Sequence, residues 1–179
     1  EGTLLTYFVD GTQDHAREDV ELGLVYSLDG GETWSDRLYT TMEGMPADTI
    51  VVDPSLVWLD DGRVRLYYFD FTTGVVPGGP VPEGKSVYSS YDFHKAISEN
   101  GIDFVYEGLV YTTDQLITDP DVIEFQDEWM MYFMSHEDVS MMVSTSDDPL
   151  AFSSQEEVNN NGIPGVIVVE DEVWLFSCG

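Results

Sequence analysis

Two aspartates occupy the same place in two similar segments of the chain, and each is followed by proline. Asp53 precedes Pro54 in DPSLVWL, and Asp119 precedes Pro120 in DPDVIEF. A carboxyl group works in acid–base chemistry near neutral pH when its surroundings shift its pKa, so two such groups could form a site. The alternative is structural, because an aspartate before proline can cap a strand by accepting backbone hydrogen bonds. The residues alone leave both roles open.

Asp121 and His136 are the further candidates for binding a substrate. Asp121 follows Asp119 by two positions, so strand alternation puts both side chains on one face. His136 comes directly after an aromatic strand, at a place suited to the rim of a channel. The spacing of His15, His94 and His136 is not that of a metal-ligand set, and we predict no metal site from them.

Calcium is the one cofactor that the acidic residues bring into question. Glu137-Asp138 and Asp147-Asp148 are adjacent carboxylate pairs, but neither belongs to the ligand series of an EF-hand loop. We expect solvated acidic turns at both places and no cofactor, with bound Ca²⁺ as the alternative.

The elements that must position these residues are short strands. Runs rich in β-branched and aromatic residues alternate with Asp, Gly and Pro, and helical periodicity is hard to find. The runs at 53–68 and 119–133 share one order: proline at a strand start, an apolar strand, an acidic turn and an aromatic strand. A third copy at 163–176 has Ile163 in place of the aspartate. The sequence therefore predicts repeated hairpins in an all-β chain with antiparallel neighbours.

A second repeated feature is a turn. The segment SLDGGETW at 27–34 is rich in turn residues, and shorter copies occur at 98–104 and 146–152 with Phe in place of Trp34. Asp29 is expected to bond backbone amides, and Trp34 to pack between sheets. Each copy follows an aromatic strand, so the turn marks the late part of a repeating module.

A module of four antiparallel strands, repeated, is a propeller blade. We predict a β-propeller built from four-stranded antiparallel blades: a partial blade at 1–45, blades at 53–108 and 119–154, and a partial blade at 162–179. This is a partial propeller with two complete and two incomplete blades. The Gly- and Pro-rich segment 72–85 is predicted to be a surface loop.

The charge of the chain excludes two classes of partner. It has 35 acidic and 6 basic residues, a formal net charge of −29. Such a surface repels nucleic acid and anionic membranes. Adaptation to high salt explains the excess better than clustered cation binding does, because the acidic residues are spread along the chain. A secreted protein or one from a high-salt environment fits this composition, and the compartment stays open. Cys178 is the single cysteine, so no intrachain disulfide is expected.

These motifs resemble those of two groups of proteins. SLDGGETW is similar to the Asp box, or BNR repeat, of sialidases and related propellers, with Ser27, Asp29, Gly31, Thr33 and Trp34 in the matching positions. The Asp-Pro hairpins resemble the inner strands of five-bladed β-propeller glycosidases of the arabinanase, β-xylosidase and invertase types. The first resemblance implies a structural turn away from any active site. The second implies that carboxylates at the starts of inner strands converge on a central pocket.

Carried over to this chain, the glycosidase resemblance implicates Asp53 and Asp119 as catalytic carboxylates. Glycoside hydrolysis uses two carboxyl groups, one as acid and one as base or nucleophile. The chain departs from the family pattern at Ile163, where a third carboxylate is expected, and at Thr118, where the invertase type has Arg. Glu107-Gly108 only faintly matches the segment that holds the acid in the arabinanase type.

The sialidase resemblance does not extend to activity, because none of the four arginines stands at the head of an inner strand. They are Arg17, Arg37, Arg63 and Arg65.

Two hypotheses for function follow. The first is a glycoside hydrolase-like propeller that acts on carbohydrate at a central acidic pocket. The second is a non-catalytic propeller module, or orphan propeller fragment, that binds sugar or protein; a homo-oligomer could complete the propeller. The aromatic residues at alternating strand positions are expected in the core, with sugar stacking as the alternative. They are Trp58, Trp129, Trp174, Tyr67 and Tyr68.

Overall fold

The computed structural model describes residues 3–10, 21–47, 49–72, 91–137, 139–158 and 162–178. Within these ranges the chain forms strands and no helix, so the all-β class is confirmed. The strands are β1 (Leu4–Asp10), β2 (Glu21–Ser27), β3 (Leu38–Tyr39), β4 (Thr41–Glu43), β5 (Val51–Trp58), β6 (Val64–Asp70), β7 (Tyr91–Ser98), β8 (Asp103–Thr113), β9 (Ile117–Phe125), β10 (Glu128–Ser135), β11 (Ser140–Ser146), β12 (Glu156–Val158), β13 (Ile163–Val169) and β14 (Glu172–Cys178). The loop predicted at 72–85 lies, apart from Thr72, outside the described residues.

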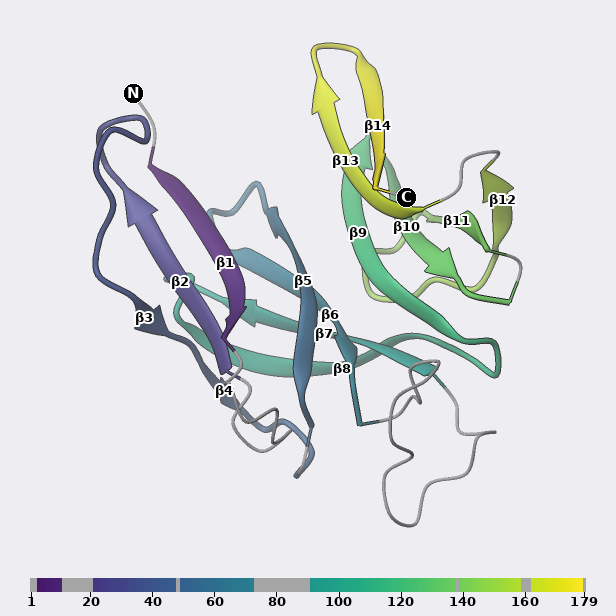
Figure 1. The fold of residues 1–179 in the computed structure, drawn as a ribbon, viewed down its shortest axis with the longest axis horizontal. Coiled ribbons are helices and arrows are strands. Elements are labelled where there is room, and N and C mark those ends of the chain that lie inside the picture. The colour runs from purple at the N-terminus through teal and green to yellow at the C-terminus, as the bar shows by residue number, and fades with distance from the viewer. Residues whose placement is uncertain are drawn as a thin grey trace.

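The strands pair into four sheets that lie side by side (Figure 1). The first sheet holds β1 to β3, the second β5 to β8, the third β9 to β12, and the last is the β13–β14 hairpin. Consecutive strands are antiparallel neighbours in all four. These are propeller blades, and two of them contain four antiparallel strands, as predicted. The first sheet and the β13–β14 hairpin lie at opposite ends of this row of sheets.

Strand β4 departs from the predicted pattern. It falls in the range 1–45 predicted for the first blade, but it pairs in parallel with β8 at the outer edge of the second sheet. The Thr41 amide donates to the Ile102 carbonyl at 3.0 Å, and its hydroxyl donates to Asp103 at 2.8 Å. The connection between the first two sheets is thereby fastened to the second.

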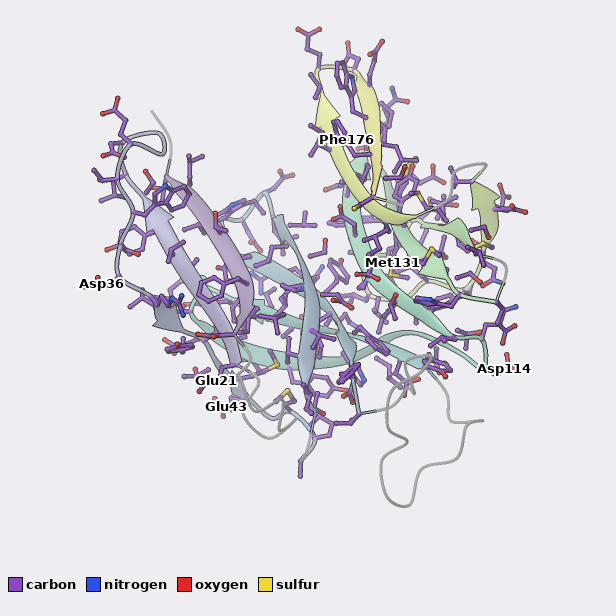
Figure 2. The ribbon with its side chains drawn as sticks, viewed as in Figure 1. Glu21, Asp36, Glu43, Asp114, Met131 and Phe176 are labelled. Carbon is purple, nitrogen blue, oxygen red and sulfur yellow. The ribbon has the colours of Figure 1, made fainter. Side chains whose placement is uncertain are left out.

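The sheets pack face to face through side chains that alternate along each strand. In β6, which is buried along its whole length, Leu66 and Tyr68 contact the first sheet, while Tyr67 and Phe69 contact the third. Met131 of β10 lies in the same aromatic core between the second and third sheets (Figure 2). A third apolar cluster joins the third sheet to the hairpin. Burial on both faces explains why these strands are so rich in aromatic residues.

The acidic residues labelled in Figure 2 lie at the outer edges of the molecule, with Glu21 and Glu43 close together in this view, and all four are exposed: Glu21, Asp36, Glu43 and Asp114. These four carboxylates are in contact with solvent. Among the described residues, no strand or turn gathers three or more potential metal ligands. The described part of the chain also has no helix long and apolar enough to cross a membrane.

The expectation that the tryptophans and tyrosines at alternating strand positions lie in the core is correct only in part. Tyr67 and Tyr68 are fully buried and Trp129 is buried, as expected. Trp58 is 61% exposed and Trp174 is 48% exposed, so neither is a core residue. Trp58 is the last residue of β5, and Trp174 lies on the one face of the hairpin that is turned away from the third sheet.

The turn at 27–34 is held by the side chain of Asp29. Its carboxylate accepts hydrogen bonds from the Thr33 amide at 2.9 Å and the Thr33 hydroxyl at 2.6 Å, and from Ser27 at 2.7 Å. These bonds, those from Thr33 foremost, lower the pKa of Asp29 to about 2. Trp34 is 46% exposed, so the expectation that it packs between sheets is wrong.

The two shorter copies of the turn share one hydrogen bond with it, in which the serine hydroxyl oxygen accepts from the amide two residues later, as Ser27 does from Asp29. Ser98 accepts a hydrogen bond from the amide of Asn100, and Ser146 accepts one from the amide of Asp148. In both, the residue that replaces Trp34 is buried: Phe104 and Phe152. The predicted repetition of this turn is therefore seen in its hydrogen bonds.

A buried lysine joins the second and third sheets. The ammonium of Lys95 in β7 donates to the carbonyls of Leu109 in β8 and Leu150 in the third turn, at 2.7 and 2.9 Å. Burial lowers the pKa of Lys95. The hydroxyl of Tyr67 donates to the Pro149 carbonyl in the same turn, at 3.0 Å. These contacts fix the position of the third sheet against the second.

We therefore expect Lys95→Met to lower the free energy of unfolding by about 2–3 kcal/mol, because it leaves two carbonyls without their charged donor. Arg63→Met is the matched control, since it also removes one positive charge but acts on a surface pair with Asp61. It should change stability by about 0.5 kcal/mol or less. Urea unfolding of both variants measures the difference; equal losses would show that the effect is general charge repulsion.

Candidate functional site

Asp53 and Asp119 lie within their strands rather than at the strand starts. Strands β5 and β9 each begin two residues before the aspartate, which corrects the expectation that Asp-Pro marks the first residues. Both aspartates have left-handed backbone, with φ of 51° and 56°, and the pairing register shifts beside each of them. Aspartate tolerates this conformation, and proline fits a bulge because it has no amide to pair. The same irregularity therefore presents both carboxylates.

The two aspartates interact. Burial, and after it the negative charge of Asp119, raise the pKa of Asp53 to about 6, against the opposing effect of a hydrogen bond from the backbone amide of Asp119. The structure thus brings together the two residues that the sequence singled out first. Asp53 is set up to hold a proton in weakly acidic solution, beside a second carboxylate.

His136 is connected to Asp119 through Thr118. The Thr118 hydroxyl donates to the Asp119 carboxylate at 2.5 Å and lies 2.8 Å from Nε2 of His136. A hydroxyl has one proton, so His136 must donate to Thr118 through an Nε2–H. His136, which the sequence predicts to bind substrate, is thus close to the aspartate pair. The partner observed for its Nε2 is the Thr118 hydroxyl.

Asp121 is fully engaged in joining the inner strands. One carboxylate oxygen accepts from the Ser55 hydroxyl of β5 at 2.9 Å, and the other accepts from the Val166 amide of β13 at 2.7 Å. Ser55 in turn accepts from the Val122 amide of β9 at 2.9 Å. Burial raises the pKa of Asp121, and these hydrogen bonds oppose the shift. Its substrate-binding role stays a prediction; the contacts seen are structural.

Thr118 and Ser55 are the members of this network that the sequence did not single out. Thr118 stood out only as a departure from the invertase pattern, and Ser55 only as part of a repeated strand. The available signal was a hydroxyl residue directly beside each Asp-Pro pair: Thr118 precedes Asp119, and Ser55 follows Pro54. Ile163, the counterpart of the two aspartates, begins β13 and is exposed, so this third position supplies no carboxylate.

A cavity of about 380 Å³ lies between β1 and β5, close to this network. Asp121 and Ser55 contribute to its wall, and the exposed Trp58 lies at its edge. An aromatic face beside polar groups is a common arrangement for binding a sugar ring. The lining residues are Leu5, Thr6, Tyr7, Pro54, Ser55, Leu56, Trp58, Val64 and Asp121.

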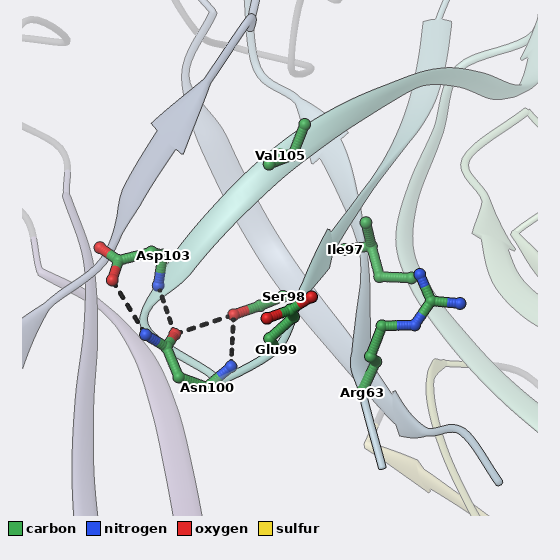
Figure 3. A pocket seen from close by; sticks show the side chains of 7 residues that line it. All are labelled: Arg63, Ile97, Ser98, Glu99, Asn100, Asp103 and Val105. Atoms are coloured by element: carbon green, nitrogen blue, oxygen red, sulfur yellow. Dashed lines mark hydrogen bonds between the residues drawn. The ribbon is translucent and has the colours of Figure 1, made fainter. Parts of the chain in front are cut away.

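A second cavity of about 310 Å³ lies beside the turn at 98–104 (Figure 3). Two of its polar side chains are already paired: Asn100 bonds to Ser98 and Asp103, and Arg63 bonds to Asp61. Val64 lines the first cavity, and Arg63, its neighbour in sequence, lines the second. Neither cavity is lined by Asp53 or Asp119.

The chain matches no protein-family model. No curated protein is similar to it in sequence. Solved structures, however, share its fold. A GH32 β-fructofuranosidase from Bombyx mori superposes with a TM-score of 0.67 at 16% identity, over 98% of this chain and 38% of that one. The GH43 β-xylosidase/α-arabinofuranosidase CoXyl43 from a compost metagenome gives 0.67 at 12% identity, over 98% and 60%.

The GH43_1 enzyme from Xanthomonas citri gives a TM-score of 0.66 at 15% identity, over 97% of this chain and 58% of that one. The predicted resemblance to five-bladed propeller glycosidases is therefore confirmed at the level of the fold. The chain spans between 38% and 60% of the length of these three structures. The resemblance of residues 27–34 to the sialidase Asp box stays a prediction.

We expect Asp53→Asn to stabilise the protein at pH 7.5 and to have little effect at pH 4. A folded pKa of about 6 lies above the ordinary 3.8, so the folded state binds the proton more tightly. Stability from this group is therefore present below pH 3.8 and is lost as the pH rises through 6. The gain at pH 7.5 should be about 1–3 kcal/mol. Asparagine also tolerates the left-handed backbone.

Asp60→Asn is the control, because Asp60 is an exposed carboxylate in the turn that follows β5. It removes the same charge without changing the buried pair. Thermal unfolding at the two pH values measures both variants. A gain for Asp53→Asn that is equal at pH 4 and pH 7.5 would mean that its carboxyl is not perturbed in the folded state.

Proposed function

We propose that this propeller acts on carbohydrate as a glycoside hydrolase, with Asp53 as the proton donor and Asp119 as the ionised partner. The observation that carries the proposal is the pair itself: two carboxylates at equivalent bulges of neighbouring inner strands, one with its pKa raised to about 6. Hydrolysis of a glycosidic bond needs one protonated and one ionised carboxyl group on either side of the sugar.

The surroundings of the two carboxylates support different roles. Burial favours the neutral form of Asp53, so it can hold a proton and deliver it to the departing sugar oxygen. Asp119 accepts a hydrogen bond from the Thr118 hydroxyl, which orients its carboxylate. As a carboxylate it can activate a water molecule or attack the sugar directly. The cavity beside Trp58 and Asp121 would hold a neighbouring part of the substrate.

The fold neighbours indicate which substrates to test. They include a β-xylosidase/α-arabinofuranosidase and a β-fructofuranosidase. Aryl β-xylosides, aryl α-arabinofuranosides and sucrose therefore form the first panel for this chain.

Asp53→Asn and Asp119→Asn should each lower kcat/KM on the responsive substrate by at least about 10²-fold, the usual contribution of general acid or base catalysis. Asp60→Asn should leave it unchanged. In the wild type, activity should decline as the pH rises above about 6, because Asp53 must be protonated to act. Initial rates from pH 4 to 9 test this; a wild type without turnover on the whole panel would refute the proposed reaction.

A non-catalytic carbohydrate-binding propeller is the second candidate. The exposed Ile163 favours it, since the third inner strand lacks a carboxylate at this position. Calorimetric titration with xylo- and arabino-oligosaccharides separates the two functions. If the wild type shows no turnover and Asp53→Asn still binds these oligosaccharides, the result favours the binding module. In that case Trp58→Ala should weaken the binding by at least about tenfold.

A further inference from the structure

The hairpins β5–β6 and β9–β10 have the same backbone hydrogen bonds around the two aspartates. In both, the residue after the second strand donates its amide across the hairpin: Phe71 to the Ile50 carbonyl at 3.0 Å, and His136 to the Leu116 carbonyl at 2.9 Å. The accepting carbonyl lies three residues before the aspartate in each case, and the pairing register shifts beside that aspartate. Phe71 and His136 therefore occupy equivalent positions in the second and third sheets.

The side chains at the equivalent positions differ in their chemistry. In the second sheet, Val52 comes directly before the aspartate, and both Val52 and Phe71 are apolar and pack against the aromatic core. The third sheet has Thr118 and His136 in their places. A hydroxyl and an imidazole thus stand beside one aspartate where two hydrocarbon side chains stand beside the other. The two aspartates have the same left-handed backbone but different surroundings.

Two hydrogen bonds in series connect His136 to Asp119. The Nε2–H of His136 donates to the Thr118 hydroxyl oxygen at 2.8 Å, and the Thr118 hydroxyl donates to Oδ2 of Asp119 at 2.5 Å. Thr118 is buried, and its place in β9 is fixed by pairing with Met134 of β10. A donor that is itself held by packing and by a further hydrogen bond restricts the rotation of the carboxylate that it contacts.

We propose that Thr118 and His136 are positioning residues for Asp119. The Thr118 hydroxyl holds Oδ2, so Oδ1 is the oxygen presented to the sugar or to the attacking water. His136 acts through Thr118: because its imidazole supplies an N–H, the single hydroxyl proton is left for Asp119. The kinetic consequence rests on the proposed function, whereas the direction of the two hydrogen bonds does not.

The protonation of Nε2 in His136 tests the direction of the hydrogen bonds without a substrate. Long-range ¹H–¹⁵N NMR spectra of the wild type at pH 7.5 distinguish a protonated imidazole nitrogen from an unprotonated one. A protonated Nε2 is expected. An unprotonated Nε2 would overturn the proposal, because the Thr118 hydroxyl would then donate to His136 and not to Asp119.

Thr118→Val tests the kinetic consequence, and Val52 shows that the fold accepts valine at the equivalent position. The variant should lower kcat on the responsive substrate by at least about tenfold, because the reacting oxygen is no longer held in place. KM should change by less than about twofold, since the cavity beside Trp58 is intact. Thr118→Ser keeps the hydroxyl and should retain at least about half of the wild-type kcat. His136→Phe, which copies Phe71, should lower kcat as well.

Thr112→Val is the matched control, because it removes a hydrogen bond between a threonine hydroxyl and Asp92 on the exposed part of β8. It should have the wild-type kcat, and circular dichroism confirms that each variant folds. A wild-type kcat in Thr118→Val would overturn the proposal, and so would a Thr118→Ser variant that is as impaired as Thr118→Val. If the wild type turns over no substrate, the proposed function fails by itself, and the protonation of Nε2 still decides whether Thr118 and His136 orient Asp119.

Discussion

The position of the inner strands depends on one partly buried carboxylate, that of Asp121. Asp121 accepts hydrogen bonds from β5 and from β13 while it is itself part of β9. Ser55 completes the connection by accepting from the backbone of β9. A carboxylate that is partly withdrawn from water is stabilised when its oxygens accept hydrogen bonds, and both bonds of Asp121 require the three strands to stay in register. That register brings Asp53 of β5 next to Asp119 of β9, and the site follows from it.

Around this centre the molecule uses one contact repeatedly. A tyrosine hydroxyl of one sheet donates to a carbonyl in the turn of the next sheet, as Tyr7 does with Gly101 and Tyr67 with Pro149. The turns keep their shape through serine and Asp or Asn side chains that bond nearby amides. The turns at 98–104 and 146–152 are thus docking surfaces for the neighbouring sheet. The carboxylate of Asp29 belongs to this scaffold, while those of Asp53 and Asp119 do not.

The sequence predicted the strands, the repeated hairpins and turns, and the propeller, because alternation and turn residues act locally. It also placed Asp53 and Asp119 at equivalent positions. It did not predict the left-handed backbone at these aspartates, since a bulge depends on the register with the neighbouring strand. The parallel pairing of β4 with β8 is a contact between distant segments that no local pattern indicates. The exposure of Trp58, Trp34 and Trp174 depends on which faces are covered, and alternation cannot show this.

The most direct test of the central claim is the titration of the Asp53 carboxyl by ¹³C NMR, in the wild type and in Asp119→Asn. The pair predicts a pKa near 6 in the wild type, where burial and the charge of Asp119 act together. In Asp119→Asn it predicts a lower value that remains above the ordinary 3.8, because burial persists. An Asp53 carboxyl that titrates near 3.8 in both proteins would contradict the coupled pair, and with it the assignment of acid and base.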